Sequence, residues 1–508
     1  MKKGFTSASL QAIRPRQQME ARLQALFGPK AQTVDSEESR HKKLGCLSLI
    51  GKQLRRSIAA ASVAIALLPS TSFAQTQNLT ANQVRGVATA ALDAGDFRLA
   101  AAASNALLSQ IPDDPTALLV RTEVAIVVRD NEGAVGFGQR AFLNAISDEQ
   151  RFTAARLIAV AHANAEQFSR SQVWLRAARQ FAPNDAAANA VAQDFRTVRN
   201  QNPLSVDLRF GITPSTNVNS GTSNDFISLS GLPFDISEDG EALSGWEITA
   251  RSNLSYRIRT DATSVTFLTF DANARAVRFT QSSRDRINND EGSELTEGDL
   301  SSTSASIGVN HRFVLAPDVG LTTAGLSFTQ NWSGGDRSRR FLTTSLSHTY
   351  TLPNTDRLTL SGFSQQQERL ETNERAQVFD LFVNYSRNFE EFGNVSFGLG
   401  LRDNAAEDPR EDFDSVRYNL SFNPADAFYG INFGFSLSYE ERDFAVDLIN
   451  DSGRNDEIIT LRARAVFSDV EFFGFQPVVT AERSSQESTS ALFDRDFTSI
   501  GFDIVSAF

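Results

Sequence analysis

The 508-residue chain has very little of several residue types on which most site chemistry depends. It contains one cysteine (Cys46), four histidines and two methionines, and no lysine follows Lys52. If a leader ending at Ala74 is removed, as argued below, no thiol is left. That excludes a disulfide framework, a thiolate metal site and a cysteine nucleophile. The histidines show no catalytic or metal-ligand spacing, so the sequence predicts no enzyme and no cofactor.

Residues 51–74 have the three parts of a secretory signal peptide. Lys52, Arg55 and Arg56 precede an apolar segment over 57–68, and small residues lead up to Ala74. The apolar segment is too short to cross a bilayer as a helix. We therefore expect cleavage between Ala74 and Gln75. Sec export fits better than twin-arginine export, because the residues beside the arginine pair match the latter poorly.

Residues 1–50, ahead of this signal, are polar and basic and unlike a folded domain. We expect a disordered extension or a start codon assigned too early. Leu44-Gly45-Cys46 could be read as a lipidation box, but no apolar segment precedes it.

The charge balance becomes strongly acidic once the leader is removed. Residues 1–74 hold four acidic residues and twelve Lys or Arg, which leaves 61 − 4 = 57 acids and 49 − 12 = 37 bases, a net charge of −20. All of these bases are arginines. Such a balance argues against nucleic acid and anionic lipid as electrostatic partners.

Residues 75–203 are rich in alanine and show a helical repeat. Gly95-Asp96-Phe97 is followed by Ala100, and Ala134 follows 34 residues later. This period resembles tetratricopeptide repeats, with a generic helical solenoid as the alternative. We expect helix pairs at 80–110, 114–146 and 148–181 and a capping helix near 184–199. His162 and the aromatic residues are interpreted as packing residues: Phe137, Phe142, Trp174 and Phe181.

From residue 204 to 508 the sequence alternates between apolar and polar residues over segments of about ten, the length that a tilted strand needs to cross a bilayer. The pattern predicts fourteen strands, an even number as in closed bacterial barrels. Their expected ranges are 204–214, 244–259, 263–279, 302–314, 319–332, 340–352, 357–367, 376–389, 394–404, 412–423, 429–442, 456–467, 473–485 and 497–508.

The connections between these strands support a barrel. Tight turns follow the even strands, whereas the odd strands are followed by longer loops such as 215–243 and 280–300. A soluble two-sheet sandwich would also alternate, but its apolar rows would need a second sheet to cover them. The acidic loop Asp285 to Asp299 could be read as a Ca²⁺ site, yet its spacing does not fit an EF-hand. The predicted fold class is thus a multidomain α + β chain with a TPR-like α-solenoid before a 14-stranded antiparallel transmembrane barrel.

The last strand ends with apolar residues two positions apart, Ile500, Phe502 and Ile504, and with Phe508. A terminal aromatic on such a strand resembles the closing strand of outer-membrane barrels, which the barrel-assembly machinery reads. A half-buried strand of a soluble domain is the alternative.

The polar face of each strand would line the inside of the barrel. A solvated, internally paired wall is the simplest interpretation of its charges. The candidate lining residues are Asp207, Arg209, Glu247, Arg251, Arg257, Asp271, Arg275, Arg462 and Arg464. His311 and His348 also lie on predicted strands, and His348 is expected to point outward.

The order of signal peptide, helical repeats and fourteen-stranded barrel resembles the surface lipoprotein assembly modulator (Slam) family. Phe210-Gly211-Ile212 leads into a segment in which Asn217 and Asn219 match the asparagines of that family's first-loop motif, with Ser220 in place of its last asparagine. The resemblance implies an outer-membrane translocon of a Gram-negative bacterium that delivers a lipoprotein or soluble secreted client to the cell surface. It implies periplasmic repeats that face the client or a periplasmic chaperone.

Two other classes stay open. Exopolysaccharide exporters also join periplasmic repeats to a barrel, whereas a passive porin would need no repeats. The sequence has no phosphate-binding loop, so any driving force would come from client folding outside.

Overall fold

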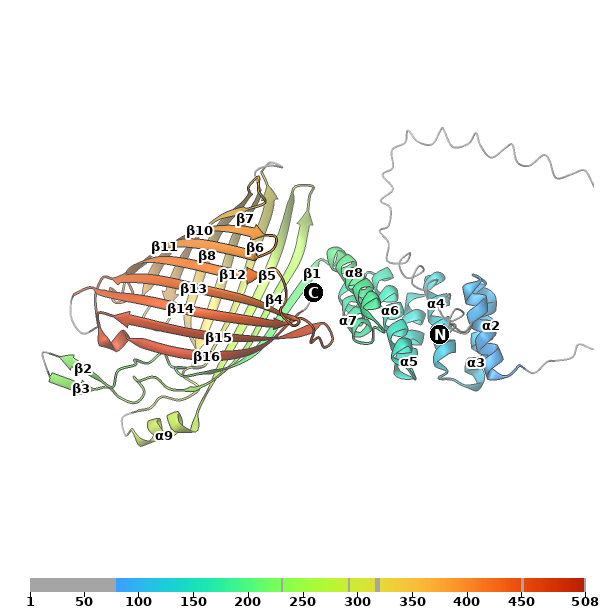
Figure 1. Ribbon diagram of the computed structural model, residues 1–508, viewed down its shortest axis with the longest axis horizontal. Coiled ribbons are helices and arrows are strands. Elements are labelled where there is room, and N and C mark those ends of the chain that lie inside the picture. The colour runs from blue at the N-terminus through green and yellow to red at the C-terminus, as the bar shows by residue number, and fades with distance from the viewer. Residues whose placement is uncertain (1–78, 230–231, 291–292, 316–319, 449–451, 507–508) are drawn as a thin grey trace, which may run out of the picture. The chain divides into compact units, whose positions relative to one another are not determined.

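A computed structural model of the chain describes residues 79–508 except 230–231, 291–292, 316–319, 449–451 and 507–508. The expectations for residues 1–74, with the cleavage site between Ala74 and Gln75, lie outside the described residues. Within them, helices between Ala81 and Gln201 precede a closed antiparallel barrel of fourteen strands (Figure 1). The predicted order of helices and barrel is confirmed.

Seven helices make up the described part of the chain before residue 202. Six of them begin at a side chain that accepts a hydrogen bond from the first turn, namely Thr80, Asp96, Asp114, Asp130, Ser147 and Asn184. Such caps satisfy backbone N–H groups that a helix leaves unpaired. The helices are α2 (Ala81–Asp93), α3 (Phe97–Gln110), α4 (Pro115–Val127), α5 (Asn131–Leu143), α6 (Asp148–Asn164), α7 (Phe168–Gln180) and α8 (Asp185–Gln201).

The 34-residue period has a structural basis. Asp96 and Asp130, 34 positions apart, cap α3 and α5. Ala100 and Ala134 share that spacing, and both are fully buried. Small side chains at these positions let neighbouring helices approach closely. The arrangement is consistent with the TPR-like repeat that the sequence predicts.

The chain divides into two compact units between Ala165 and Glu166, inside the helical region. The composition predicts a change from helix to strand at 203/204, and α8 ends at Gln201 while β1 begins at Leu204. The boundary between compact units lies one helix pair earlier. Helices α7 and α8 therefore belong to the same unit as the barrel.

The first unit has a conventional helical core. Leu118, Ala141 and Ala154 form one buried cluster, against which Phe137 and Phe142 pack. These two aromatics are packing residues, as the sequence suggests. His162 is also buried.

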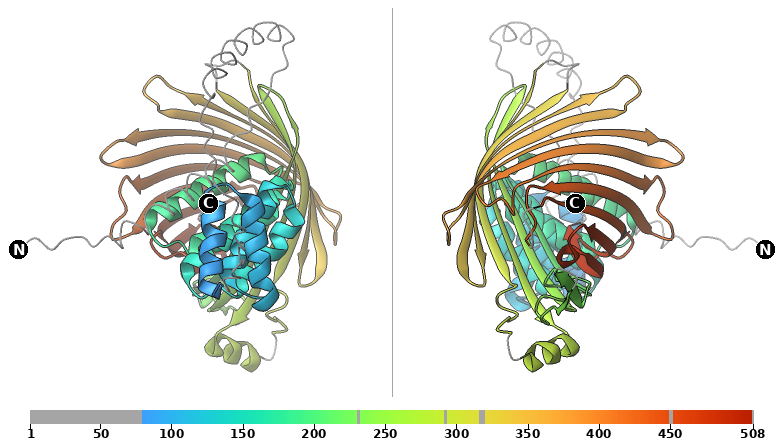
Figure 2. Two further views of the ribbon diagram at one scale, coloured as in Figure 1. Left: turned by 90° about the vertical axis from the view of Figure 1, so that its right-hand side faces the viewer. Right: turned by 90° about the vertical axis from the view of Figure 1, so that its left-hand side faces the viewer.

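Each barrel strand pairs with its neighbours in sequence, and β1 closes against β16. The described strands of the barrel are β1 (Leu204–Ser215), β4 (Gly245–Thr260), β5 (Ser264–Phe279), β6 (Ser302–Val314), β7 (Leu321–Ser333), β8 (Asp336–Thr351), β9 (Arg357–Arg369), β10 (Arg375–Phe389), β11 (Gly393–Ala406), β12 (Phe413–Pro424), β13 (Ile431–Phe444), β14 (Arg454–Phe467), β15 (Phe475–Ser488) and β16 (Arg495–Ser506). Figure 2 shows how the strands curve round to close the cylinder.

The outer face of this cylinder carries rows of exposed apolar side chains. Phe210 and Ile212 on β1 are 55% and 47% exposed, and their partners on β16, Ile504 and Phe502, are 52% and 55% exposed. Similar rows recur round the barrel, for example Phe435 and Leu437 on β13. A closed sheet with such an exterior satisfies its own backbone and leaves only side chains to meet hydrocarbon.

None of the helices in the described part of the chain is long and apolar enough to cross a membrane.

The two ends of the barrel differ. Short connections join the strands at the end next to α8, and the two longest connections, after β1 and β5, lie at the other end (Figure 1). The prediction of longer loops at that end is met only in part, because β7 and β8 are joined there by Gly334 and Gly335 alone. The longer connections are not the plain loops expected at 215–243 and 280–300. The first contains a hairpin of β2 (Phe226–Leu229) and β3 (Leu232–Asp235), and the second contains α9 (Gln281–Asn289). Helix α9 has one apolar residue, Ile287, so its sequence shows no apolar period to detect.

Helix α7 is docked on the turn end of the last two strands. The Arg176 guanidinium donates to the carbonyl oxygen of Gly474 and the hydroxyl of Ser506, both at 2.9 Å. It also lies over the ring of Phe475 at 4.8 Å. Burial lowers the pKa of Arg176, with Glu471 opposing that shift. Arg179 adds an ion pair to Glu471 at 2.6 Å.

Side-chain hydrogen bonds also fix the connection between α8 and β1. The Asn202 amide nitrogen donates to Ser169 and Gln172 of the α7 region, and its oxygen accepts the N–H of Leu204. Arg257, at the turn end of β4, donates to the carbonyl oxygen of Asn200 at 2.9 Å and to those of the next two residues. A cation at these carbonyls also complements the helix dipole. The last helix pair is thus part of the barrel's turn end.

We predict that Arg176→Ala loosens α7 from the barrel, because it removes two hydrogen bonds and a cation–π contact worth together about 3 kcal/mol. Hydrogen exchange of α7 amides in the detergent-solubilised protein should then accelerate roughly a hundredfold. Arg170→Ala on the same helix is the matched control, because this side chain is exposed and its one hydrogen bond among the described residues is to Gln167. Equal exchange in both variants would contradict the docking.

Candidate functional site: the inner wall of the barrel and its first loop

The strand register fixes which side chains face inward. Because side chains alternate along a strand, residues next to the outward Phe210 row face the interior. Directly opposite residues share a face, so Arg209 and Arg251 lie side by side on the inner wall of β1 and β4. The register places every charged residue predicted for the lining on this inner face, namely Asp207, Arg209, Glu247, Arg251, Arg257, Asp271, Arg275, Arg462 and Arg464.

The inner wall carries more arginine than the sequence pattern suggested. Following the register round all described strands gives fifteen inward arginines and nine inward acids, an excess of 15 − 9 = 6 positive charges. The arginines are Arg209, Arg251, Arg257, Arg275, Arg312, Arg339, Arg357, Arg369, Arg402, Arg417, Arg442, Arg454, Arg462, Arg464 and Arg495, and the acids are Asp207, Glu247, Asp271, Asp336, Asp380, Glu440, Asp456, Glu482 and Asp503. The wall is positive in a chain whose net charge is −12.

Many of the inward charges pair along the wall. Arg402 and Arg417 both reach the buried carboxylate of Asp380, at 2.9 and 3.3 Å. Further ion pairs join Arg209 to Asp207, Arg275 to Glu247, Arg442 to Glu440, Arg454 to Asp456, and Arg462 to Glu482. At the loop end, Arg339 and Arg369 both pair with Glu411.

The loop end of the wall between β13 and β16 is packed tightly. The Arg454 guanidinium lies between the rings of Phe444 and Phe493, at 3.7 and 3.6 Å. It donates to Asp456, which is 1% exposed and also accepts from Ser488. This part of the wall is tightly packed, although the Arg495 Nε and the Ser490 hydroxyl are buried without a hydrogen-bond partner among the described residues.

The turn end of the wall is different, because its arginines lack carboxylate partners. Arg312, Arg357 and Arg464 are exposed inward-facing residues near the turn ends of β6, β9 and β14. None of the three has an ion pair within the part of the chain that the structure describes; Arg312 lies over the Phe267 ring at 5.1 Å. Their exposure indicates that water reaches the inner wall at this end.

The seam between β1 and β16 is the shortest ladder of the barrel. Four residue pairs join these strands in the described part of the chain, against twelve between β1 and β4. Pro214 has no N–H to give to a ladder. Gly211 sits where an added Cβ would collide with the Asp503 carboxylate across the seam. The paired stretch stops at Phe210 and Ile504; beyond it, the α7 region bonds both Ser506 of β16 and Asn202, which precedes β1.

The first loop fastens the other end of the seam. Thr216 donates its N–H to the Thr498 carbonyl oxygen at 3.1 Å, and the N–H of Thr498 returns to the Thr216 hydroxyl at 3.0 Å. Ser223 makes a similar exchange with Asp494 and Asp496. The loop after β1 therefore ties the first strand to the last.

Asn217 and Asn219, which match the first-loop motif, shape this loop. Asn217 exchanges two hydrogen bonds with the backbone of Gly221, at 2.8 and 2.9 Å. The Asn219 amide donates to the carbonyl oxygens of Asp239 and Glu241 and accepts the N–H of Leu243. Both side-chain amides form these hydrogen bonds with backbone groups. Their role in the structure is to hold the loop.

An apolar cluster packs the first loop against the inner wall. Val218 and Leu243 from the loop meet Val277 and Phe279 of β5 and Ile287 of α9. Arg275 donates to the Val218 carbonyl oxygen at 2.8 Å. This cluster closes part of the loop end of the barrel from inside.

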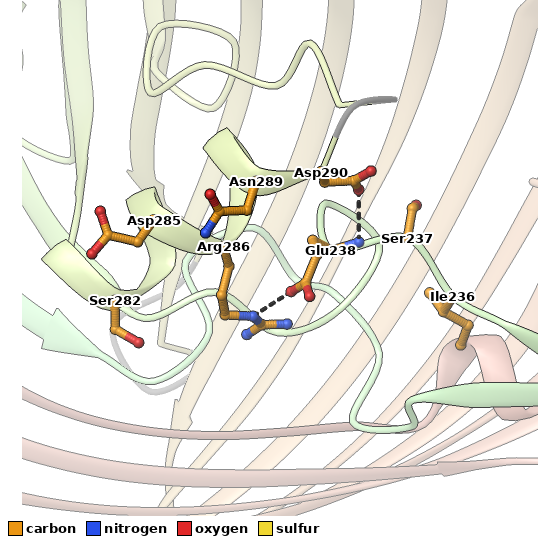
Figure 3. A pocket seen from close by; sticks show the side chains of 8 residues that line it. All are labelled: Ile236, Ser237, Glu238, Ser282, Asp285, Arg286, Asn289 and Asp290. Carbon is orange, nitrogen blue, oxygen red and sulfur yellow. Dashed lines mark hydrogen bonds and ion pairs between the residues drawn. The ribbon is translucent and has the colours of Figure 1, made fainter.

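A shallow cavity of about 800 Å³ lies between the first loop and α9 (Figure 3). Arg286 points from α9 into it and pairs with Glu238 and Glu241. Desolvation raises the pKa of Glu241, although the charge of Arg286 opposes this shift. The acidic stretch 285–299 thus takes part in a salt-bridged loop contact. In the described residues no group of three potential metal ligands comes together.

The histidines lie outside any such cluster. His311 and His348 both face outward, each at hydrogen-bond distance from a threonine hydroxyl, Thr266 and Thr322 respectively. The outward orientation of His348 agrees with the prediction.

Sequence reasoning missed the positive excess on the inner wall, because it took charges from a few strands only. The sequence did contain this information. Once the outward residues of a strand are known, an arginine at an odd number of positions from one of them faces inward. It also missed the loop contacts of Glu238, Glu241 and Glu297, which depend on long-range pairing that no local pattern reveals.

No protein-family model and no curated protein matches the chain. Among solved structures, OccAB4 of Acinetobacter baumannii covers 59% of this chain and 97% of its own, with 11% identity and a TM-score of 0.31. OpdK of Pseudomonas aeruginosa, solved with vanillate, covers 60% and 98%, with 9% identity and a TM-score of 0.30. A bacterial polysaccharide outer membrane secretin covers 60% and 98%, with 8% identity and a TM-score of 0.30. At these values the barrel assignment rests on the strand register itself.

We predict that Asn219→Asp releases the first loop, because a carboxylate cannot donate to the two carbonyl oxygens that the amide now serves. The loss of two partly buried hydrogen bonds should cost about 2 kcal/mol locally. Proteolysis within 216–243 should become faster than in the wild type. Asn289→Asp, an exposed position on α9 with the same chemical change, should leave the cleavage rate unaltered.

A second prediction concerns pH. Desolvation raises the pKa of Glu297, but hydrogen bonds from Arg284 and from the N–H of Phe279 outweigh it, so that the pKa is lowered overall. A lowered carboxyl pKa stabilises the fold above the unfolded pKa, and the contribution disappears as pH falls through the folded value. Glu297→Gln should therefore reduce the exchange protection of the Phe279 amide near neutral pH and make little difference in acid. If the difference in exchange protection between variant and wild type did not change with pH, this linkage would be contradicted.

Proposed function

We propose that this chain is an outer-membrane translocon of a Gram-negative bacterium that delivers a specific lipoprotein or secreted protein to the cell surface. The observation that carries the proposal is the docking of α7 and α8 on the turn end of a barrel with an apolar exterior. A helical repeat region that continues into the wall of a barrel links recruitment of a cargo to the entrance of a conduit.

The apolar exterior supports insertion in the outer membrane. In a soluble protein the exposed Phe and Leu rows would form a patch far larger than the few hundred Å² that a monomer usually exposes. In outer-membrane barrels the tight turns are periplasmic and the longer loops extracellular. The helical region, which leads into β1 at the turn end, would then lie in the periplasm.

The partners follow from this placement. The outward row of Ile500, Phe502 and Ile504 on β16 suits recognition by the barrel-assembly machinery and contact with outer-membrane lipid. Phe508, the other residue of that signal, lies outside the described residues. The repeats before Glu166 would bind the client or a periplasmic chaperone, as solenoid surfaces do.

The first-loop motif adds support for a Slam-like role. Asn217 and Asn219 hold the loop that joins β1 to the loop end of β16. In the proposed translocon this loop keeps the seam closed on the extracellular side.

Export of an exopolysaccharide is a second candidate, and one observation favours it. An inner wall with an arginine excess suits an anionic polymer of sugars as well as an acidic protein. The structure does not require a protein cargo, so the experiment must separate the two.

We predict that deletion of residues 79–165 leaves the barrel folded and inserted but abolishes client display, since this unit is compact by itself and α7 and α8 remain on the barrel. Barrel folding is measured by heat-modifiable electrophoretic mobility, and display by mass spectrometry of peptides shaved from intact cells. Deletion of 79–201 should in addition impair barrel assembly, because it removes the partners of Gly474, Glu471 and Ser506.

An unchanged surface proteome in the 79–165 deletion would contradict the translocon proposal. Loss of surface polysaccharide with an unchanged proteome would assign the chain to polysaccharide export. Small-solute conductance with neither loss would assign it to the porins.

A further inference from the structure

We propose that the turn-side entrance of the barrel is a cationic binding site for an acidic, carboxylate-rich polypeptide segment, which enters the conduit first. This inference rests on the proposed function and specifies the chemistry of its cargo.

The site is formed by Arg312, Arg357 and Arg464, which face inward from three separate strands at the turn end. Each is exposed, and none pairs with a carboxylate in the described chain. Arg251, farther along the wall, is likewise exposed and without an ion pair among the described residues. The entrance therefore presents guanidinium groups whose donors are available to a ligand.

The rest of the wall does not cancel this charge. Of the nine inward acids, six are already joined to arginine: Asp207, Glu247, Asp380, Glu440, Asp456 and Glu482. Of the other three, Asp271 accepts a hydrogen bond from Asn253, Asp336 lies at the loop end of β8, and Asp503 lies opposite Gly211 of β1. The inward charge left over on the strands is positive, and Arg312, Arg357 and Arg464 place part of it at the end through which cargo would enter.

A positive wall favours anions and rejects cations. Within a cylinder of low dielectric constant the field of such groups is focused along the axis, which raises the local concentration of an oppositely charged ligand. Guanidinium groups bind carboxylates with two parallel hydrogen bonds and need not be deprotonated or reorganised to do so. A basic segment would meet repulsion at every step.

The wall also suits a moving ligand. Exposed charge pairs contribute about 1 kcal/mol or less each, so a chain held by several of them can exchange one contact for the next. The paired arginines deeper in the wall, such as Arg209 and Arg462, sit beside these free ones and are about half exposed. An acidic segment could pass along the wall without being trapped.

The test uses the full mature chain in detergent and a fluorescent poly-L-glutamate of about 30 residues, with binding followed by anisotropy at low ionic strength. We expect saturable binding that is lost near 1 M salt, where the screening length falls to about 3 Å. The variant Arg312→Gln/Arg357→Gln/Arg464→Gln should bind about tenfold more weakly. Poly-L-lysine of the same length should not bind.

The matched control changes three arginines outside the inner wall, Arg259→Gln/Arg375→Gln/Arg387→Gln, and so alters net charge equally. It should bind like the wild type. All variants are first checked for heat-modifiable mobility, which shows that the barrel is folded. Equal weakening in both triple variants, absence of polyglutamate binding, or preference for polylysine would each overturn the inference.

A polyuronate of similar length separates the two kinds of anionic polymer. Binding of polyuronate with no binding of polyglutamate would overturn the choice of a polypeptide. Failure of the proposed function would show as an unchanged surface proteome in the 79–165 deletion, whereas failure of the cationic entrance would show in the binding assay. The two failures are therefore distinguishable. Polyglutamate binding together with an unchanged display of clients would support the cationic entrance and contradict the translocon proposal.

Discussion

A strand that crosses hydrocarbon must give every backbone N–H and C=O a partner on a neighbouring strand, and this requirement organises the whole second unit. It needs a last strand that returns to the first, and β16, the last of fourteen barrel strands, pairs with β1. It also makes that closing seam the critical place. Here the ladder is short and carries Pro214, and both of its ends are reinforced, by the first loop at one end and by α7 at the other.

The reinforcement links structure to the proposed role. Because Arg176 joins α7 to the ends of β15 and β16, the helix pair that continues from the repeats is also a part of the barrel's closure. The charge distribution of the barrel points to the same end. An acidic chain without lysine in its described part places a net excess of arginine on its inner wall, and three arginines without carboxylate partners among the described residues, Arg312, Arg357 and Arg464, lie at the turn end. Closure and charge thus both single out the turn end of the barrel, which α7 and α8 adjoin.

Period-two alternation predicted the strands well, because one face meets water and the other does not. The strand expected at 302–314 has those bounds in the structure, whereas β8 begins at Asp336, four residues before its expected start, because the hairpin tip is polar on both faces. The local pattern could not predict α9, whose helix lacks an apolar stripe, or the part played by Asn219, whose partners lie about 20 residues away. The inward positions of Arg209 and Arg464 follow from the alternation of side chains along each strand. Whether each arginine forms an ion pair depends instead on the residues of neighbouring strands.

The most direct test of the account is nitroxide scanning along β13 in membranes. In a Cys46→Ser background, single cysteines at Phe435, Ser436, Leu437 and Ser438 carry the label. The account predicts a two-residue alternation: labels at 435 and 437 are relaxed by oxygen dissolved in lipid, and those at 436 and 438 by a water-soluble nickel chelate. If all four positions were shielded from both reagents, the strand would lie in a dry protein core and the transmembrane barrel would be contradicted.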